Sequence, residues 1–149
     1  MGISVDGVEE HIKWKADIET VGGAKAGFPI IADSDLTVAK AFDMLPADAY
    51  LPDGRTPNDS ATVRAVFIIG PDKQLKLSMT YPMTVGRNFA EVLRALDGLQ
   101  TSTGRGVATP ANWNVGDDVI IPATLSDEDA TAKFGEFTKV LPYLRKTSL

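Results

Sequence analysis

Hydrophobic and polar positions repeat with two different periods along the chain, which predicts a mixture of helices and strands. Helical spacing is found over residues 8–21, where Gly22 and Gly23 would end the helix. It is clearest in a segment that begins at Phe89, where apolar residues recur every three or four positions. We expect this second helix to end at Gly104 and Gly106.

Strand-like patterns lie between these two helices. Residues 28–32 are a short apolar run, and residues 63–69 are almost wholly apolar, which is typical of a strand covered on both faces. Residues 75–81 alternate between apolar and polar side chains, which predicts a half-exposed strand. The Gly-Pro-Asp-Lys turn at 70–73 makes this strand antiparallel to the one before it, with Asp72 as a turn former.

The remaining segments are shorter. Residues 1–6 read as the end of a strand, and Asp33-Ser34-Asp35 provides a cap for a helix over 36–44. Residues 45–60 carry prolines and aspartates and are expected to be a loop. After the extended pieces of 107–125, Ser126 caps a helix through Phe134, and residues 135–149 are expected to be irregular.

The order of these elements predicts the fold class. Strand–helix–strand units imply a parallel portion, and the hairpin implies an antiparallel one, a mixture that suits a thioredoxin-like α/β sandwich. The change from a helical pattern to short extended pieces at residues 104–106 predicts a domain boundary. We therefore expect one domain over residues 1–103 and a small α+β domain over residues 104–149.

Composition narrows the possible functions. The chain has 149 residues, of which 44% are hydrophobic and 23% are charged, with a net charge of −5. Lysine and arginine are scattered among carboxylates, which argues against a nucleic-acid partner. No stretch approaches the roughly 20 apolar residues of a membrane span.

The chain contains no cysteine, so it can perform no thiol chemistry as written and form no disulfide. His11 is the single histidine, which excludes a histidine-cluster metal site, and we expect neither a metal nor a cofactor. His11 reads as a surface or helix-face residue. Trp14 and Trp113 read as packing residues.

Two arginines are the candidates for chemistry. Arg64 lies at the mouth of the most apolar strand, so its guanidinium must reach solvent, pair with a carboxylate, or face an anion. Arg87 precedes the helix that begins at Phe89, where a cation is unfavourable to the helix dipole, so we expect it to have another partner. From chemistry alone, a structural role is the commoner explanation for both.

The residues around these arginines form a pattern that is similar to a known family. It comprises Thr62-Val63-Arg64-Ala65-Val66-Phe67-Ile68-Ile69-Gly70-Pro71-Asp72-Lys73, then Leu75-Lys76-Leu77-Ser78, Tyr81-Pro82 and Gly86-Arg87-Asn88-Phe89. It resembles the one-cysteine peroxiredoxins with an extended C-terminal domain. Residues 4–14, 28–33 and 107–113 continue the resemblance, which covers essentially the whole chain.

The resemblance implies a thiol peroxidase with an antioxidant role. In this family a cysteine thiolate reduces hydrogen peroxide or an alkyl hydroperoxide and becomes a sulfenic acid, which an external thiol restores. The residues that match Arg64 and Arg87 stabilise the thiolate and hold the peroxide.

The resemblance also implies an assembly. It predicts a homodimer or higher homo-oligomer that forms through residues 75–81, without a cofactor. The absence of cysteine fits a reducing compartment, and we expect the chain in the cytoplasm. The strand residues expected at this interface are Leu75, Leu77, Met79 and Tyr81.

The chain departs from the family at its reactive residue. The family's cysteine lies in a Pro-x-x-x-Thr-x-x-Cys segment that would precede residue 1, so we expect the chain to match the last two-thirds of a peroxiredoxin, N-terminally incomplete and inactive alone. A strand would then be absent between residues 1–5 and 63–69, and the gap would be filled by an unseen N-terminal part, by a partner, or by repacking. The alternative is a non-catalytic dimerisation or interaction module derived from a peroxiredoxin.

Overall fold

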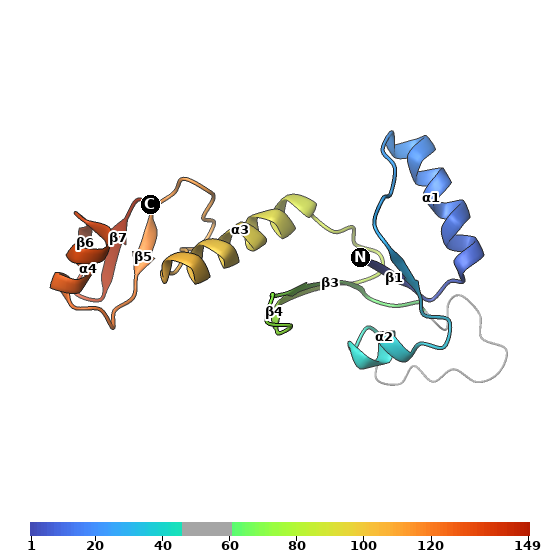
Figure 1. The fold of residues 1–149 in the computed structure, drawn as a ribbon, viewed down its shortest axis with the longest axis horizontal. Helices are drawn as coiled ribbons and strands as arrows, with labels where there is room; N and C mark the ends of the chain where they lie inside the picture. The colour runs from blue at the N-terminus through green and yellow to red at the C-terminus, as the bar shows by residue number, and fades with distance from the viewer. Residues whose placement is uncertain (46–60) are drawn as a thin grey trace. The chain divides into compact units, whose positions relative to one another are not determined.

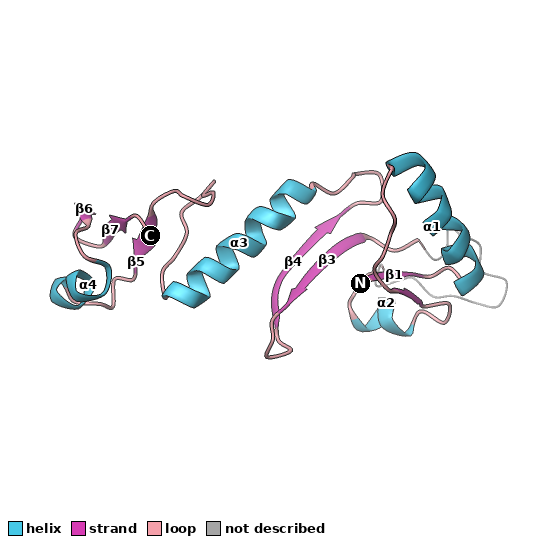
Figure 2. Ribbon diagram, turned by 45° about the horizontal axis from the view of Figure 1, so that its top comes forward, coloured by secondary structure: helices cyan, strands magenta, loops and turns pink. Residues whose placement is uncertain are grey.

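The computed structural model describes residues 1–45 and 61–149, whose helices and strands are drawn in Figure 1 and Figure 2. The chain divides into two compact units. The N-terminal unit comprises Met1–Val66 and Met79–Arg87, and the C-terminal unit comprises Phe67–Ser78 and Asn88–Leu149. The loop expected at 45–60 lies outside the described residues, apart from its first position.

The N-terminal unit begins with a strand–helix–strand arrangement. Strand β1 (Gly2–Ser4) is followed by helix α1 (Val8–Gly22) and strand β2 (Ile30–Ala32). The two strands pair in parallel, with Gly2 opposite Ile30, which confirms the expected parallel portion. Helix α1 ends where the sequence predicts, because Gly23 adopts a left-handed conformation with φ of 67° and its N–H donates to the Glu19 carbonyl oxygen.

Helix α2 (Thr37–Ala41) is shorter than the expected helix over 36–44. Its start is delayed because Leu36 has a φ of 63°, a left-handed conformation that does not continue a helix, and this side chain is buried. The Asp33 carboxylate caps the helix as expected. It accepts the N–H groups of Val38 and Ala39 at 2.9 and 2.7 Å.

Strands β3 (Arg64–Ile69) and β4 (Leu75–Tyr81) form a two-stranded sheet that is joined by the predicted turn (Figure 2). The Gly70 N–H donates to the Gln74 carbonyl oxygen at 2.9 Å. The expectation that β3 is covered on both faces is wrong. Its two end residues are exposed and the others are half-buried, so neither face of the strand is fully covered within the described residues.

Helix α3 (Phe89–Arg105) belongs to the C-terminal unit. The Asn88 side chain caps it by accepting the N–H groups of residues 90 and 91. Gly106, with a φ of 66°, ends it, whereas Gly104 lies inside the helix and does not help to end it as we expected. Only the second glycine takes up the left-handed conformation that a helix end requires.

The C-terminal unit is completed by strand β5 (Val119–Ile121), helix α4 (Asp127–Phe134), strand β6 (Thr138–Leu141) and strand β7 (Leu144–Thr147). These strands form an antiparallel sheet in the order β5-β7-β6. As predicted, the Ser126 side chain caps α4, accepting the Asp129 N–H at 3.0 Å.

The expectation that residues 135–149 are irregular is wrong, because they contain the β6–β7 hairpin. The sequence of β7 does not show an alternation of apolar and polar residues, because the buried positions are the polar Arg145 and Thr147. Leu144 and Lys146 are half-buried. A strand is normally recognised by apolar residues at its buried positions, and Arg145 occupies such a position here. The core of this unit gathers Val107, Trp113 and Val119, with Phe134 packed against them.

None of the helices in the described part of the chain is long and apolar enough to cross a membrane.

Candidate functional site

Arg64 occupies the first position of β3, and its side chain is exposed. Its Nε donates a hydrogen bond to the carbonyl oxygen of Met83 at 2.7 Å. Met83 lies in the segment that follows β4, so this bond joins the two ends of the hairpin. The bond engages Nε and does not use the two terminal nitrogens of the guanidinium.

The segment after β4 also carries Arg87. A turn in which the Val85 N–H donates to the Pro82 carbonyl oxygen at 2.9 Å leads to Asn88, the cap of α3. Arg87 is exposed and lies four positions after Met83. The hydrogen bond from Arg64 therefore ties β3 to the segment that holds the second candidate arginine.

Met83 is a residue that the sequence analysis missed. Its contribution to the anchor of Arg64 is a backbone carbonyl oxygen, which every residue type provides, so no side-chain pattern indicates it. The sequence carries no other signal for this contact.

The four residues expected at a dimer interface lie on β4. Leu77, Met79 and Tyr81 are half-buried, whereas Leu75 is exposed. The polar residues between them are exposed, so the predicted alternation is confirmed. One edge of β4 pairs with β3, and the other edge has no strand neighbour within the described residues.

The aromatic and histidine predictions have different outcomes. Trp113 is a packing residue: it is buried, and its indole N–H donates to the Asp117 carbonyl oxygen at 3.0 Å. Trp14 is not, because it is exposed on α1. His11 lies on α1 but is buried, so it is not a surface residue, and its Nε2 has no hydrogen-bond partner among the described residues.

A third arginine, Arg145, has a structural role in the C-terminal unit. It is buried, and it donates to the Asp127 carboxylate at 2.8 Å and to the carbonyl oxygens of Pro122 and Leu125. Lys139 contacts the same carboxylate at 2.7 Å. The hydrogen bonds from Lys139 and Arg145 lower the pKa of Asp127 below its ordinary value. This cluster fastens β6 and β7 to the start of α4.

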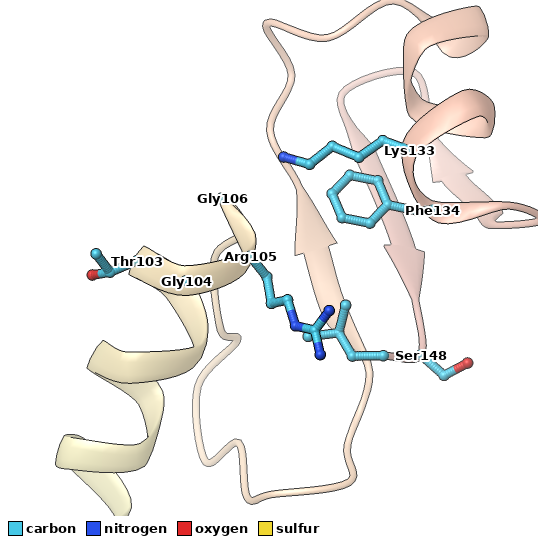
Figure 3. A pocket seen from close by; sticks show the side chains of 8 residues that line it. Thr103, Gly104, Arg105, Gly106, Lys133, Phe134 and Ser148 are labelled. Atoms are coloured by element: carbon cyan, nitrogen blue, oxygen red, sulfur yellow. The ribbon is translucent and has the colours of Figure 1, made fainter.

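A cavity of about 540 Å³ lies in the C-terminal unit, beside the end of α3 (Figure 3). Its wall includes Arg105 and Lys133, and the Lys133 Nζ lies 5.0 Å from the centroid of the Phe134 ring. The wall contains no Asp or Glu side chain and no residue that the sequence analysis proposed for chemistry. The cations at this cavity lie beside the last turns of α3 and α4, where a positive charge is favourable.

Family models match most of the chain. Residues 1–78 match the AhpC/TSA family, and residues 98–136 match the C-terminal domain of 1-Cys peroxiredoxin. The chain belongs to the peroxiredoxin family. This confirms the resemblance that was stated from the residues around Arg64 and Arg87.

Individual peroxiredoxins match over nearly the full chain. The mitochondrial peroxiredoxin PRX1 of Saccharomyces cerevisiae is 48% identical over 150 residues, which cover 99% of this chain and 56% of that protein. Peroxiredoxin-6 of Gallus gallus is 46% identical over 157 residues, covering 99% of this chain and 68% of the relative. The chain thus spans little more than half of the yeast relative's length.

Solved peroxiredoxin structures establish the fold. The structure of yeast mitochondrial 1-Cys peroxiredoxin superposes with a TM-score of 0.87 at 47% identity, covering 99% of this chain and 69% of that one. A cysteine-to-serine mutant of peroxiredoxin 6 from Arenicola marina gives 0.86 at 42% identity, with coverage of 98% and 68%. The thioredoxin-like α/β fold of the peroxiredoxins, predicted from the order of elements, is therefore confirmed.

Proposed function

We propose that this chain provides the peroxide-binding arginines of a thiol peroxidase that reduces hydrogen peroxide and alkyl hydroperoxides. The observation that carries the proposal is the position of Arg64: it is exposed at the start of β3, with Nε anchored to the Met83 carbonyl oxygen. An anchored guanidinium keeps its forked donors in place for an anion. Arg87 follows on the segment to which Arg64 is anchored and is proposed to be the second arginine of the same pocket.

The proposed reaction needs such donors. A cysteine thiolate attacks one oxygen of the hydroperoxide, the O–O bond breaks, and the leaving oxygen takes a proton to become water or an alcohol. The cysteine becomes a sulfenic acid, which an external thiol then reduces. A guanidinium lowers the pKa of the thiol and stabilises the negative charge that develops on the leaving oxygen.

The chain contains no cysteine, so we propose that its 149 residues do not turn over peroxide catalytically alone. The resemblance implies a cysteine-bearing segment that this chain does not contain. Among the described residues, β1 pairs with β2 alone and β3 pairs with β4 alone, so β1 and β3 each have an edge without a strand neighbour. We propose that the cysteine-bearing segment pairs at these edges.

A chimera tests the proposal. The cysteine-bearing N-terminal segment of the yeast relative is joined to residue 1 of this chain, and peroxide consumption is followed with dithiothreitol as the reductant. We expect activity in the chimera and none in the 149-residue chain. Arg64→Gln should lower kcat/KM by about 10² to 10³, the usual effect of removing one donor to a developing oxyanion.

The matched control is Arg105→Gln, which removes an exposed arginine of the C-terminal unit. It should leave kcat/KM unchanged. If the Arg64→Gln and Arg105→Gln variants of the chimera have the same kcat/KM, Arg64 is not part of the peroxide site.

The alternative function is a non-catalytic dimerisation or interaction module, which the absence of cysteine favours.

Both functions use β4, and we propose that the chain forms a homodimer through Leu75, Leu77, Met79 and Tyr81. Sedimentation should show a dimer that Met79→Arg converts to a monomer, because a charge would be buried at the interface. A monomer at all concentrations would contradict the dimer, and an inactive, well-folded chimera would favour the interaction module.

Two further predictions complete the proposal. Limited proteolysis tests the proposed division at residues 103 and 104, which lies in the last turn of α3, because a stable fragment that begins near residue 104 supports it and one that begins near Asn88 contradicts it. The cytoplasmic location expected from the sequence stays a prediction, and the yeast relative is a mitochondrial protein. An antibody to this chain, applied to mitochondrial and cytosolic fractions of its host, would decide between the two compartments.

A further inference from the structure

Met83 is an exposed residue whose backbone accepts a hydrogen bond from Arg64. It is 47% exposed, and its carbonyl oxygen accepts the Arg64 Nε hydrogen at 2.7 Å. The side chain therefore starts from a backbone that the guanidinium itself holds. The remaining methionines have different environments: Met1 is 85% exposed at the first position, Met79 is half-buried on β4, and Met44 is 6% exposed.

We propose that Met83 is an oxidation site, where the hydroperoxide bound by Arg64 converts the thioether to a sulfoxide. The inference rests on the proposed function, because it takes Arg64 as the group that binds the peroxide. It goes beyond that function in naming a second acceptor of the peroxide oxygen, one that this chain itself contains.

The chemistry is a two-electron transfer that needs no further reactant. A lone pair on the Met83 sulfur attacks the terminal oxygen of the hydroperoxide, and an S–O bond forms as the O–O bond breaks. The departing oxygen takes the proton and leaves as water or an alcohol. The methionine is oxidised to the sulfoxide, and the peroxide is reduced.

Arg64 would accelerate this step in two ways. Its forked donors hold the hydroperoxide beside the residue that carries the thioether, so the encounter no longer depends on diffusion. Its positive charge stabilises the leaving oxygen as the O–O bond breaks. Exposure alone predicts faster oxidation of Met1 than of Met83, whereas arginine assistance predicts the opposite order.

The test is a time course of oxidation of the 149-residue chain with hydrogen peroxide, with tert-butyl hydroperoxide as a second oxidant. Peptide mapping by mass spectrometry gives a rate constant for each of the methionines. N-acetyl-methionine amide in the same tube supplies the rate of a fully exposed thioether. We expect Met83 to react about tenfold faster than Met1 and the free amide, and Met44 to react most slowly.

Variants identify the cause of the acceleration. Arg64→Gln and Arg64→Lys both lack the anchored fork, and each should reduce the Met83 rate to that of the free amide while Met1 is unaffected. Because Arg64 is exposed, both variants should fold, which far-UV circular dichroism verifies. Arg105→Gln is the matched control and should leave the Met83 rate unchanged. Rates that follow exposure, or a Met83 rate that is independent of Arg64, would overturn the proposal.

The outcome is separable from that of the proposed function. If the activity of the chimera depends on Arg64 while Met83 oxidises no faster than the free amide, the inference about Met83 fails and the peroxidase proposal stands. If Arg64 influences neither chimera activity nor Met83 oxidation, both proposals fail.

Discussion

Two arginines on short strands have opposite environments in the two units. Arg145 of β7 is buried and donates to one carboxylate and two carbonyl oxygens, so its charge is used in holding the C-terminal sheet to α4. Arg64 of β3 is exposed, and its Nε is held by a hydrogen bond to a carbonyl oxygen. The same side chain type thus serves folding at one place and is exposed at the other.

The sheets around these arginines differ in the same sense. In the three-stranded sheet, the Val119 and Ile121 side chains of β5 are fully buried. In the two-stranded sheets, no residue of β1, β2 or β3 is buried. The C-terminal sheet therefore has a core of its own. The two-stranded sheets depend on additional contacts, because a pair of strands is only marginally stable without further packing.

The largest expected contrast is in hydrogen exchange. Amides of β5 and β7 should exchange at least about a hundredfold more slowly than those of β1 and β3, because local opening costs less where few apolar groups are buried. Amide exchange of the 149-residue chain, followed by NMR, measures this ratio. Equal protection in all sheets would remove the contrast between the units.

The second contrast concerns core side chains. Ile121→Ala should lower the free energy of unfolding by about 2–5 kcal/mol, because it leaves a cavity at a fully buried position. The matched change Ile69→Ala affects an exposed residue of β3 and should cost less than about 0.5 kcal/mol. Urea unfolding of both variants provides the comparison, and similar losses would show that β3 is as well packed as β5.

The buried arginine should matter more than the exposed cation that shares its carboxylate. Arg145→Met removes hydrogen bonds to the Pro122 and Leu125 carbonyl oxygens as well as the ion pair, and should cost about 2–4 kcal/mol. Lys139→Met removes an exposed ion pair to Asp127 and should cost less than about 1 kcal/mol. Thermal unfolding with a van't Hoff analysis would detect the difference, and equal losses would contradict the structural role assigned to Arg145.

The smallest effect is a pH dependence of the C-terminal unit. Since folding lowers the pKa of Asp127, the unfolded chain binds this proton more readily than the folded chain. The stability from this carboxylate is therefore complete above its unfolded pKa of about 3.9 and is lost as pH falls through the lower folded value.

Urea midpoints measured from about pH 6 to about pH 2 should fall over that interval. The fall should be smaller in Asp127→Asn than in the parent. The contribution of Asp72, whose pKa is lowered mainly by the Lys76 hydrogen bond, should persist in both proteins. Identical profiles would show that the Asp127 cluster does not stabilise the fold.

Features that depend on local rules could be predicted from the sequence. The α3 segment, the turn around Asp72 and the Ser126 cap follow from apolar spacing, turn chemistry and capping, and the structure has all of them. The parallel pairing of β1 and β2 followed from the helix between them.

Features that depend on distant contacts were missed. The buried position of Arg145 could not be predicted, because its partners lie 18 to 23 residues away along the chain. The Met83 carbonyl that anchors Arg64 is 19 residues away and has no side-chain signature. The roles of Arg64 and Arg87 were expected from a family resemblance and not from the charges of the residues themselves.

The most direct test of the account is the pKa of the reactive cysteine in the chimera with the yeast N-terminal segment. The pH dependence of its alkylation by iodoacetamide reports the thiolate fraction. With Arg64 present, the pKa should lie well below the ordinary value of about 8.5, and Arg64→Gln should raise it by about one unit or more. A pKa that is the same with and without Arg64 would contradict the claim that this arginine faces the reacting thiolate.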